Sequence, residues 1–174
     1  MRTRFTELVG CRLPLQLAVL GGVGTVELAR AVQQTGGLGM VPRRVRVPEP
    51  RSGALGKGFL IPYLPPLEEV VECVRGLRVA EFFWGEPQAE IVAAAHTVGS
   101  LVSWQVGSGD EGRPAEAAGC DLLVAQGVEA GGHVRGAQPL DELRVGTRFL
   151  ACPECDTHPE YVQALPHQAP AIQR

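Results

Sequence analysis

Short apolar runs alternate with amphipathic segments along most of the chain. The apolar runs are four to six residues long, which is typical of parallel strands covered on both faces. The segments between them repeat apolar residues at helical spacing, which is typical of helices packed along one side. The predicted strands are residues 15–20, 38–41, 59–64, 79–84, 101–106, 121–126 and 143–146, and the predicted helices are 25–35, 66–77, 87–98, 110–118 and 157–165. This alternation predicts parallel βα units.

Two architectures contain such units, an open doubly wound sheet and a closed (β/α)₈ barrel. Nearly every apolar run ends in a polar or glycine-rich cluster. These clusters are residues 21–22, 84–86, 105–108, 126–127 and 146–148. Functional residues at the ends of many strands are typical of a barrel, whereas in an open sheet they lie at one switch point. The pattern therefore favours an α/β fold of the TIM-barrel type.

Length and composition narrow the class further. The chain has 174 residues, which fits one domain, predicted at 1–165 with a loose Pro-containing tail at 166–174.

The net charge of −3 offers no basic field for nucleic acid and no polybasic patch for a membrane. No apolar stretch approaches the roughly 20 residues of a membrane span, and polar residues interrupt any signal-peptide pattern near the N-terminus. Five scattered cysteines fit a reducing, cytoplasmic setting.

Three strand-end motifs could carry chemistry. Residues 21–24 read Gly-Gly-Val-Gly, either a tight turn or a loop facing a cofactor, but the third glycine of a dinucleotide fingerprint is replaced by Glu27. Residues 126–133 end in Gly-Gly-His, so that His133 is either a general base for a carbon acid or a surface-loop histidine. Gly146 and Thr147 follow a late strand, where barrels often bind phosphate.

A Cys-x-x-Cys pair at Cys152 and Cys155 is a weaker candidate. The motif can be a redox site or half of a zinc site, but no second pair stands at ligand spacing. The sequence therefore predicts no metal site. The single lysine, Lys57, is the one residue available for Schiff-base chemistry.

Five stretches in series resemble the nitronate monooxygenase (2-nitropropane dioxygenase-like) family. They are residues 35–40 (TGGLGM), 79–85 (VAEFFWG), 102–108 (VSWQVGS), 124–133 (VAQGVEAGGH) and 145–150 (VGTRFL). The stretch ending in His133 is the most specific of them. The resemblance implies an FMN-dependent barrel that oxidises alkyl nitronates to carbonyl compounds and nitrite with oxygen.

The resemblance also implies residue roles. His133 resembles the catalytic histidine, Gly131 and Gly132 the glycines beside flavin and substrate, and Gly146 and Thr147 half of the phosphate site. Gln105 and Gln126, at the ends of two predicted strands, are expected to contact the cofactor.

This chain is shorter than the family pattern. Only ten residues separate His133 from Arg144, where the family has a complete strand, a phosphate loop and helices. We therefore expect an incomplete barrel of about seven strands that lacks the seventh family strand. Self-association could cover the resulting gap. The alternative function is a non-catalytic remnant with an impaired flavin site.

Overall fold

A parallel sheet of five strands forms the centre of the computed structural model, which describes residues 2–48, 53–130 and 134–135. The strands are β1 (Gly39–Pro42), β2 (Leu55–Leu60), β3 (Val79–Phe83), β4 (Leu101–Val106) and β5 (Leu122–Ala125). Each strand pairs with the next one along the chain, in the order β1-β2-β3-β4-β5. This sequential order is that of a barrel, since an open doubly wound sheet reverses its order at the switch point.

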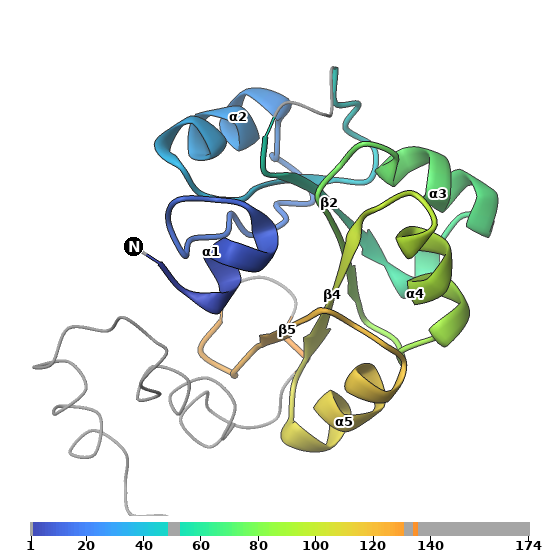
Figure 1. The fold of residues 1–174 in the computed structure, drawn as a ribbon. Coiled ribbons are helices and arrows are strands. Elements are labelled where there is room, and N and C mark those ends of the chain that lie inside the picture. Colours follow the sequence, from blue (N-terminus) through green and yellow to red (C-terminus); the bar gives the residue numbers. More distant parts are fainter. Residues whose placement is uncertain (1, 49–52, 131–133, 136–174) are drawn as a thin grey trace, which may run out of the picture.

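Helices surround the sheet in the described part of the chain. They are α1 (Arg4–Val9), α2 (Val26–Thr35), α3 (Leu67–Val74), α4 (Ala89–His96) and α5 (Gly109–Ala117), with a short 3₁₀ turn at Ile61–Tyr63. Figure 1 shows α3, α4 and α5 on one side of the sheet and α1 on the other. Among the described residues, no helix combines the length and apolar character needed to cross a membrane.

Local signals place the helix ends. The Thr25 side chain accepts a hydrogen bond from the Leu28 N–H at 3.2 Å and so caps α2. Gly36 ends the same helix at φ 110°, a left-handed conformation that glycine adopts without strain. Ser108 caps α5 in the same way, by accepting from the Glu111 N–H at 3.2 Å.

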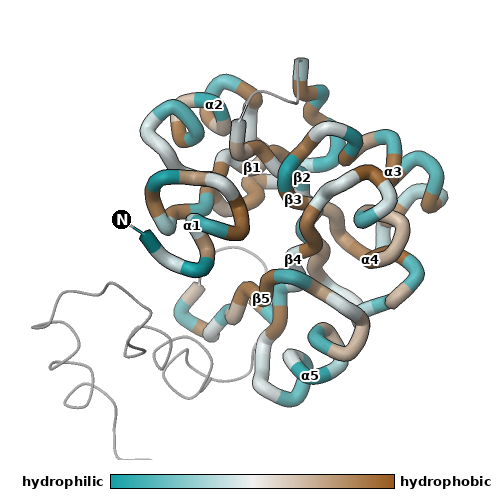
Figure 2. The backbone as a smooth tube through the Cα atoms, viewed as in Figure 1, coloured by the Kyte–Doolittle hydropathy of each residue, from teal (hydrophilic) through white to brown (hydrophobic). Residues whose placement is uncertain are grey.

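The two faces of the sheet pack against different partners. Phe82 and Trp104 lie in a cluster with side chains of α3, α4 and α5, which form the outer layer. Val79 and Leu101 point to the opposite face of the same two strands. They pack with Val9 of α1 in the interior of the barrel. In Figure 2 the strands are largely brown while the outer turn of α3 is teal, as expected for this layering.

The structure confirms the predicted fold class and most element positions. The predicted strand 101–106 coincides with β4, and the predicted helix 25–35 differs from α2 by one residue. Helix α1 was not predicted because it has only six residues, held by a capping box between Thr3 and Thr6. The predicted strand 143–146 and helix 157–165 lie outside the described residues.

Two predicted strands were misplaced. The predicted third strand, 59–64, corresponds to β2, which begins upstream at Leu55 and ends at Leu60. It ends there because Ile61–Tyr63 form a 3₁₀ turn and Pro62 has no N–H for a ladder. The predicted first strand, 15–20, makes only an isolated parallel bridge between Gln16 and Leu38. The Leu17 N–H donates to the Leu38 carbonyl and the Leu38 N–H donates to the Leu15 carbonyl, and the chain leaves the sheet beyond Leu17.

Candidate functional site

A row of polar side chains lies on the inner face of the sheet. The strand register pairs Glu81 of β3 with Ser103 of β4, and Gln105 of β4 with Val124 of β5. Because successive residues of a strand alternate between faces, these side chains point away from the outer helices that contact Phe82 and Trp104. The carboxyl edge of the inner face is therefore polar.

Glu81 is the buried acid of this row. Its residue surface is 6% exposed, and its carboxylate accepts a hydrogen bond from the Gln16 side-chain amide. Burial raises the pKa of Glu81 from 4.5 to about 7, against the smaller opposing effects of Gln16 and Ser103. The buried Ser103 hydroxyl lies close enough to lower this pKa but makes no hydrogen bond of standard geometry in the described structure. Near neutral pH, Glu81 therefore exists in both protonation states.

The raised pKa of Glu81 predicts a pH-dependent stability. The folded chain holds a proton that the unfolded chain releases between about pH 4.5 and 7, so the free energy of unfolding falls as pH rises through this window. The Glu81→Gln variant keeps a neutral acceptor for Gln16 and has no proton to lose. We expect it to be about 3 kcal/mol more stable than the native chain at pH 8, and close to it at pH 4. Urea unfolding at both pH values measures the difference, and a pH-independent difference would contradict the assignment.

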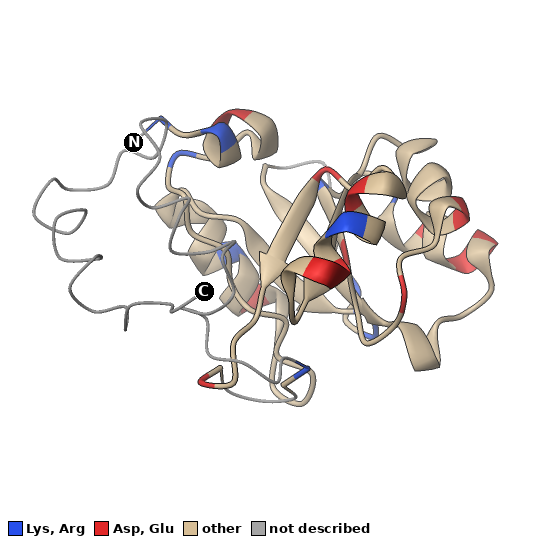
Figure 3. Cartoon of the chain, turned by 90° about the horizontal axis from the view of Figure 1, so that it is seen from below, with Lys and Arg blue, Asp and Glu red and all other residues tan. Residues whose placement is uncertain are grey.

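A second network ties together the ends of three strands. The Arg135 guanidinium pairs with Glu111 at 2.9 Å and with Glu86 at 3.2 Å, and its backbone N–H donates to Gln126 Oε1 at 3.1 Å. Glu111 also accepts from the Gly107 N–H at 2.8 Å. These contacts join the loops that follow β3, β4 and β5. In Figure 3 charged residues lie mainly on helices and loops, as this network does.

The structure brings together two of the predicted site residues. Gln105 lies one residue before the end of β4, and Gln126 follows the end of β5 on the neighbouring strand. A carboxamide offers both donors and an acceptor, so this pair could bind the polar edge of a planar heterocycle. The other predicted site residues lie outside the described residues; they are Gly131, Gly132, His133, Gly146 and Thr147.

The loop at 21–24 is a tight turn. Its Gly24 N–H donates to the Leu20 carbonyl at 2.8 Å, and a Cβ on Gly24 would lie 2.7 Å from that oxygen. Position 24 therefore requires glycine for packing reasons, whereas a Cβ at Gly21 or Gly22 would meet open space. In the described part of the chain, no group of three His, Cys, Asp or Glu residues could hold a metal ion, and Cys152 and Cys155 lie outside it.

Sequence reasoning missed the buried acid and the bridging arginine. Glu81 had a usable signal, because a single carboxylate inside an otherwise apolar strand run is unusual. Arg135 had none, since its partners stand 24 and 49 residues away in the sequence.

The fold and the strand-end site define part of a (β/α)₈ barrel with polar side chains at its carboxyl edge. Residues 67–144 match the family model described as nitronate monooxygenase. A nitronate monooxygenase of Pseudomonas aeruginosa is 25% identical over 259 positions, covering 95% of this chain and 74% of the relative. These matches support a relationship between the chain and the nitronate monooxygenase family.

Other similar proteins include enzymes of different names. A Mycobacterium tuberculosis protein named as a 5-hydroxy-7a-methyl-1-oxo-octahydro-1H-indene-4-carboxyl-CoA dehydrogenase is 28% identical over 145 residues, covering 76% of this chain. The chain spans only 41% of that relative's length. The structure of FabK from Thermotoga maritima superposes with a TM-score of 0.73 and 25% identity, covering 94% of this chain and 67% of that one. A nitroalkane oxidase from Streptomyces ansochromogenes shares the fold, with a TM-score of 0.67 and 22% identity.

The Pseudomonas alignment supports a shortened barrel. It extends over 259 positions although this chain has 174 residues, so a long stretch of the relative has no counterpart here. Such a gap agrees with the expectation that part of the family's barrel is absent from this chain.

Proposed function

We propose that this chain is an FMN-dependent oxidoreductase that oxidises alkyl nitronates to carbonyl compounds and nitrite with oxygen. The observation that carries the proposal is the placement of Gln105 near the end of β4 and of Gln126 just after the neighbouring β5, in a chain similar to this family. Barrel enzymes bind their ligands at this edge. The cytoplasm is the proposed location, with a small nitronate or nitroalkane and oxygen as the reaction partners.

The side chains at this edge fit the polar edge of a flavin ring. A pyrimidine ring alternates hydrogen-bond donors and acceptors, and a carboxamide can match either. Gln105 is half-buried and Gln126 is 8% exposed, so hydrogen bonds from them would be partly shielded from water. The Arg135 contact fixes the Gln126 amide, because the backbone N–H occupies Gln126 Oε1.

The remaining roles come from the family resemblance and belong to the proposal. Gly146 and Thr147 would donate backbone N–H groups and a hydroxyl to the phosphate, and Gly131 and Gly132 would allow close approach of the ring. His133 would accept the proton from the α-carbon of a neutral nitroalkane. FMN, when bound, supplies the electron acceptor and the reactivity with oxygen that amino-acid side chains lack.

Oxygen uptake and nitrite release test the proposal. The full chain is mixed with excess FMN and propane-2-nitronate, and both quantities are followed together. We expect oxygen uptake and nitrite release above those of FMN alone, and a loss of both in Gln105→Leu. A folded chain that adds nothing to the reaction of free FMN would contradict the proposal and favour the non-catalytic alternative.

A further inference from the structure

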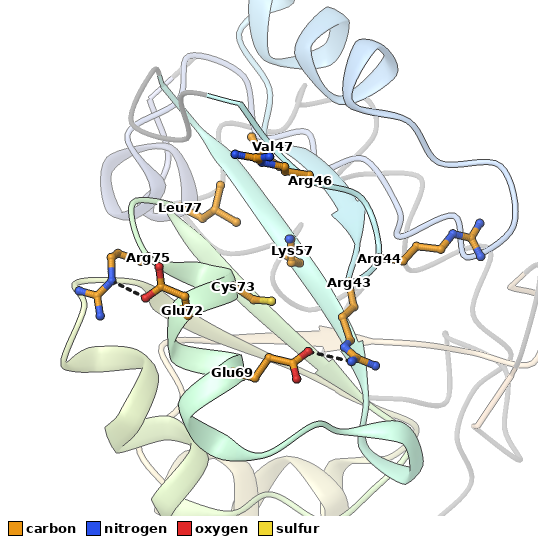
Figure 4. A pocket seen from close by; sticks show the side chains of 10 residues that line it. All are labelled: Arg43, Arg44, Arg46, Val47, Lys57, Glu69, Glu72, Cys73, Arg75 and Leu77. Atoms are coloured by element: carbon orange, nitrogen blue, oxygen red, sulfur yellow. Dashed lines mark hydrogen bonds and ion pairs between the residues drawn. The ribbon is translucent and has the colours of Figure 1, made fainter.

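A cavity opens on the outer face of the sheet, the face opposite the inner polar row. The connections from β2 to β3, β3 to β4 and β4 to β5 each contain a helix that packs against the strands. The connection from β1 to β2 contains no helix in its described residues, 43–48 and 53–54. A cavity of about 530 Å³ lies there, between this connection, β2 and α3 (Figure 4).

The cavity carries an excess of positive charge. Its described lining includes the cationic residues Arg43, Arg44, Arg46, Lys57 and Arg75, and only two acidic residues, Glu69 and Glu72. Both acidic residues are paired on the rim, Glu69 with Arg43 at 2.9 Å and Glu72 with Arg75 at 3.0 Å. Figure 4 shows these two pairs beside the centre of the cavity.

The remaining cations have no carboxylate partner in the described part of the chain. Arg44 donates to the Gly22 carbonyl at 2.8 Å, which uses its hydrogen-bonding capacity without neutralising its charge. Arg46 and Lys57 have neither a carboxylate nor a hydrogen-bond acceptor among the described residues. Among the described lining residues, no carboxylate therefore offsets the positive charge around Lys57.

Lys57 is the deepest of these cations. It lies in the middle of β2, is 5% exposed and occupies the centre of the cavity in Figure 4. At this outward-facing position other strands of the sheet carry apolar residues, such as Ala80 on β3. Burial lowers the pKa of the Lys57 ammonium; the neighbouring Cys73 of the cavity lining opposes this shift, and Arg43 adds a smaller effect in the lowering direction. A largely buried ammonium with no carboxylate beside it among the described residues is costly, and an anion in the cavity would offset that cost.

We propose that this cavity binds a small phosphate monoester, with the phosphate held by Lys57 and Arg46. A phosphate dianion suits the cavity better than a carboxylate, because two of its cations have no carboxylate partner among the described residues. The cavity volume falls in the range of small-molecule sites, which leaves room for an organic group beside the apolar Val47 and Leu77. The site lies on the opposite face of the sheet from Gln105 and does not depend on the proposed oxidoreductase activity.

The single lysine makes the site directly testable. The full chain is acetylated with a limiting activated ester, and mass spectrometry follows Lys57 against the N-terminal amine as internal reference. Ribose 5-phosphate is the probe and ribose the neutral control, at constant ionic strength. We expect saturating ribose 5-phosphate to slow acetylation of Lys57 about tenfold relative to the N-terminal amine, and ribose to leave it unchanged.

Two variants separate a built site from general charge attraction. Arg46→Gln removes one proposed phosphate contact and should raise the concentration for half-protection about tenfold. Arg113→Gln removes the same charge from an exposed pair on α5 and should leave protection intact. Absence of protection, equal protection by ribose, or equal weakening by both variants would overturn the proposal.

Discussion

The His133→Ala variant is expected to lose about 10²–10⁴-fold in turnover of a neutral nitroalkane while keeping most of its turnover of the corresponding nitronate. A neutral nitroalkane must lose a proton from carbon before it can be oxidised, and the proposed role of His133 is to accept it. The nitronate has already lost that proton. Steady-state oxygen uptake with both substrates, at saturating FMN, measures the two losses.

A second histidine provides the control. His96 lies in the last turn of α4 and hydrogen-bonds Asp121 at 2.8 Å, away from the carboxyl ends of the strands. His96→Gln should leave the ratio of the two activities unchanged. Equal losses on both substrates in His133→Ala would contradict the base assignment and indicate a structural role for this histidine.

The Trp104→Ala variant is expected to lose about 3–5 kcal/mol of unfolding free energy. Trp104 is 1% exposed, lies in the outer-layer core and stacks on Phe82 with ring centroids 5.2 Å apart. Its indole N–H also donates to the Gly85 carbonyl at 3.1 Å, which fixes the loop after β3 at the carboxyl edge. The substitution removes the packing, the stacking and this hydrogen bond together. Urea unfolding followed by circular dichroism measures the loss.

Two further variants keep this prediction testable if Trp104→Ala does not fold. Trp104→Phe retains an aromatic ring and should lose less than the alanine variant, mainly through the hydrogen bond to Gly85. Tyr63→Ala removes a large aromatic side chain that is 70% exposed, and should change stability by less than about 0.5 kcal/mol. A Trp104→Phe chain as stable as the native one, together with a destabilised Tyr63→Ala, would contradict the described packing.

Elements with both a clear pattern and a clear boundary could be predicted from the sequence. Strand β4 is flanked by Gly99 and Gly107, and helix α2 starts at a threonine cap and ends at Gly36. Strand β2 could not be placed, because three of its six residues are Gly or Lys and its apolar pattern continues into the 3₁₀ turn. Pairing with the neighbouring strands, and not the local apolar pattern, determines where β2 begins and ends.

The candidate site could be predicted only in part. The ends of predicted strands identified Gln105 and Gln126, because parallel strands present their carboxyl ends at one edge. The environment of Lys57 could not be inferred, although its being the only lysine was evident. Its burial depends on the packing of β2 against α3 and on a connection without a described helix, and neither is encoded by local periodicity.

The FMN content of the purified full chain tests most directly whether this shortened barrel is a flavin enzyme. The visible spectrum gives the flavin-to-protein ratio, and titration of the stripped chain with FMN gives the affinity. We predict substoichiometric flavin on purification, saturable rebinding of one FMN, and weaker rebinding by Gln105→Leu. A well-folded chain that binds no FMN at any concentration tested would contradict the proposed function.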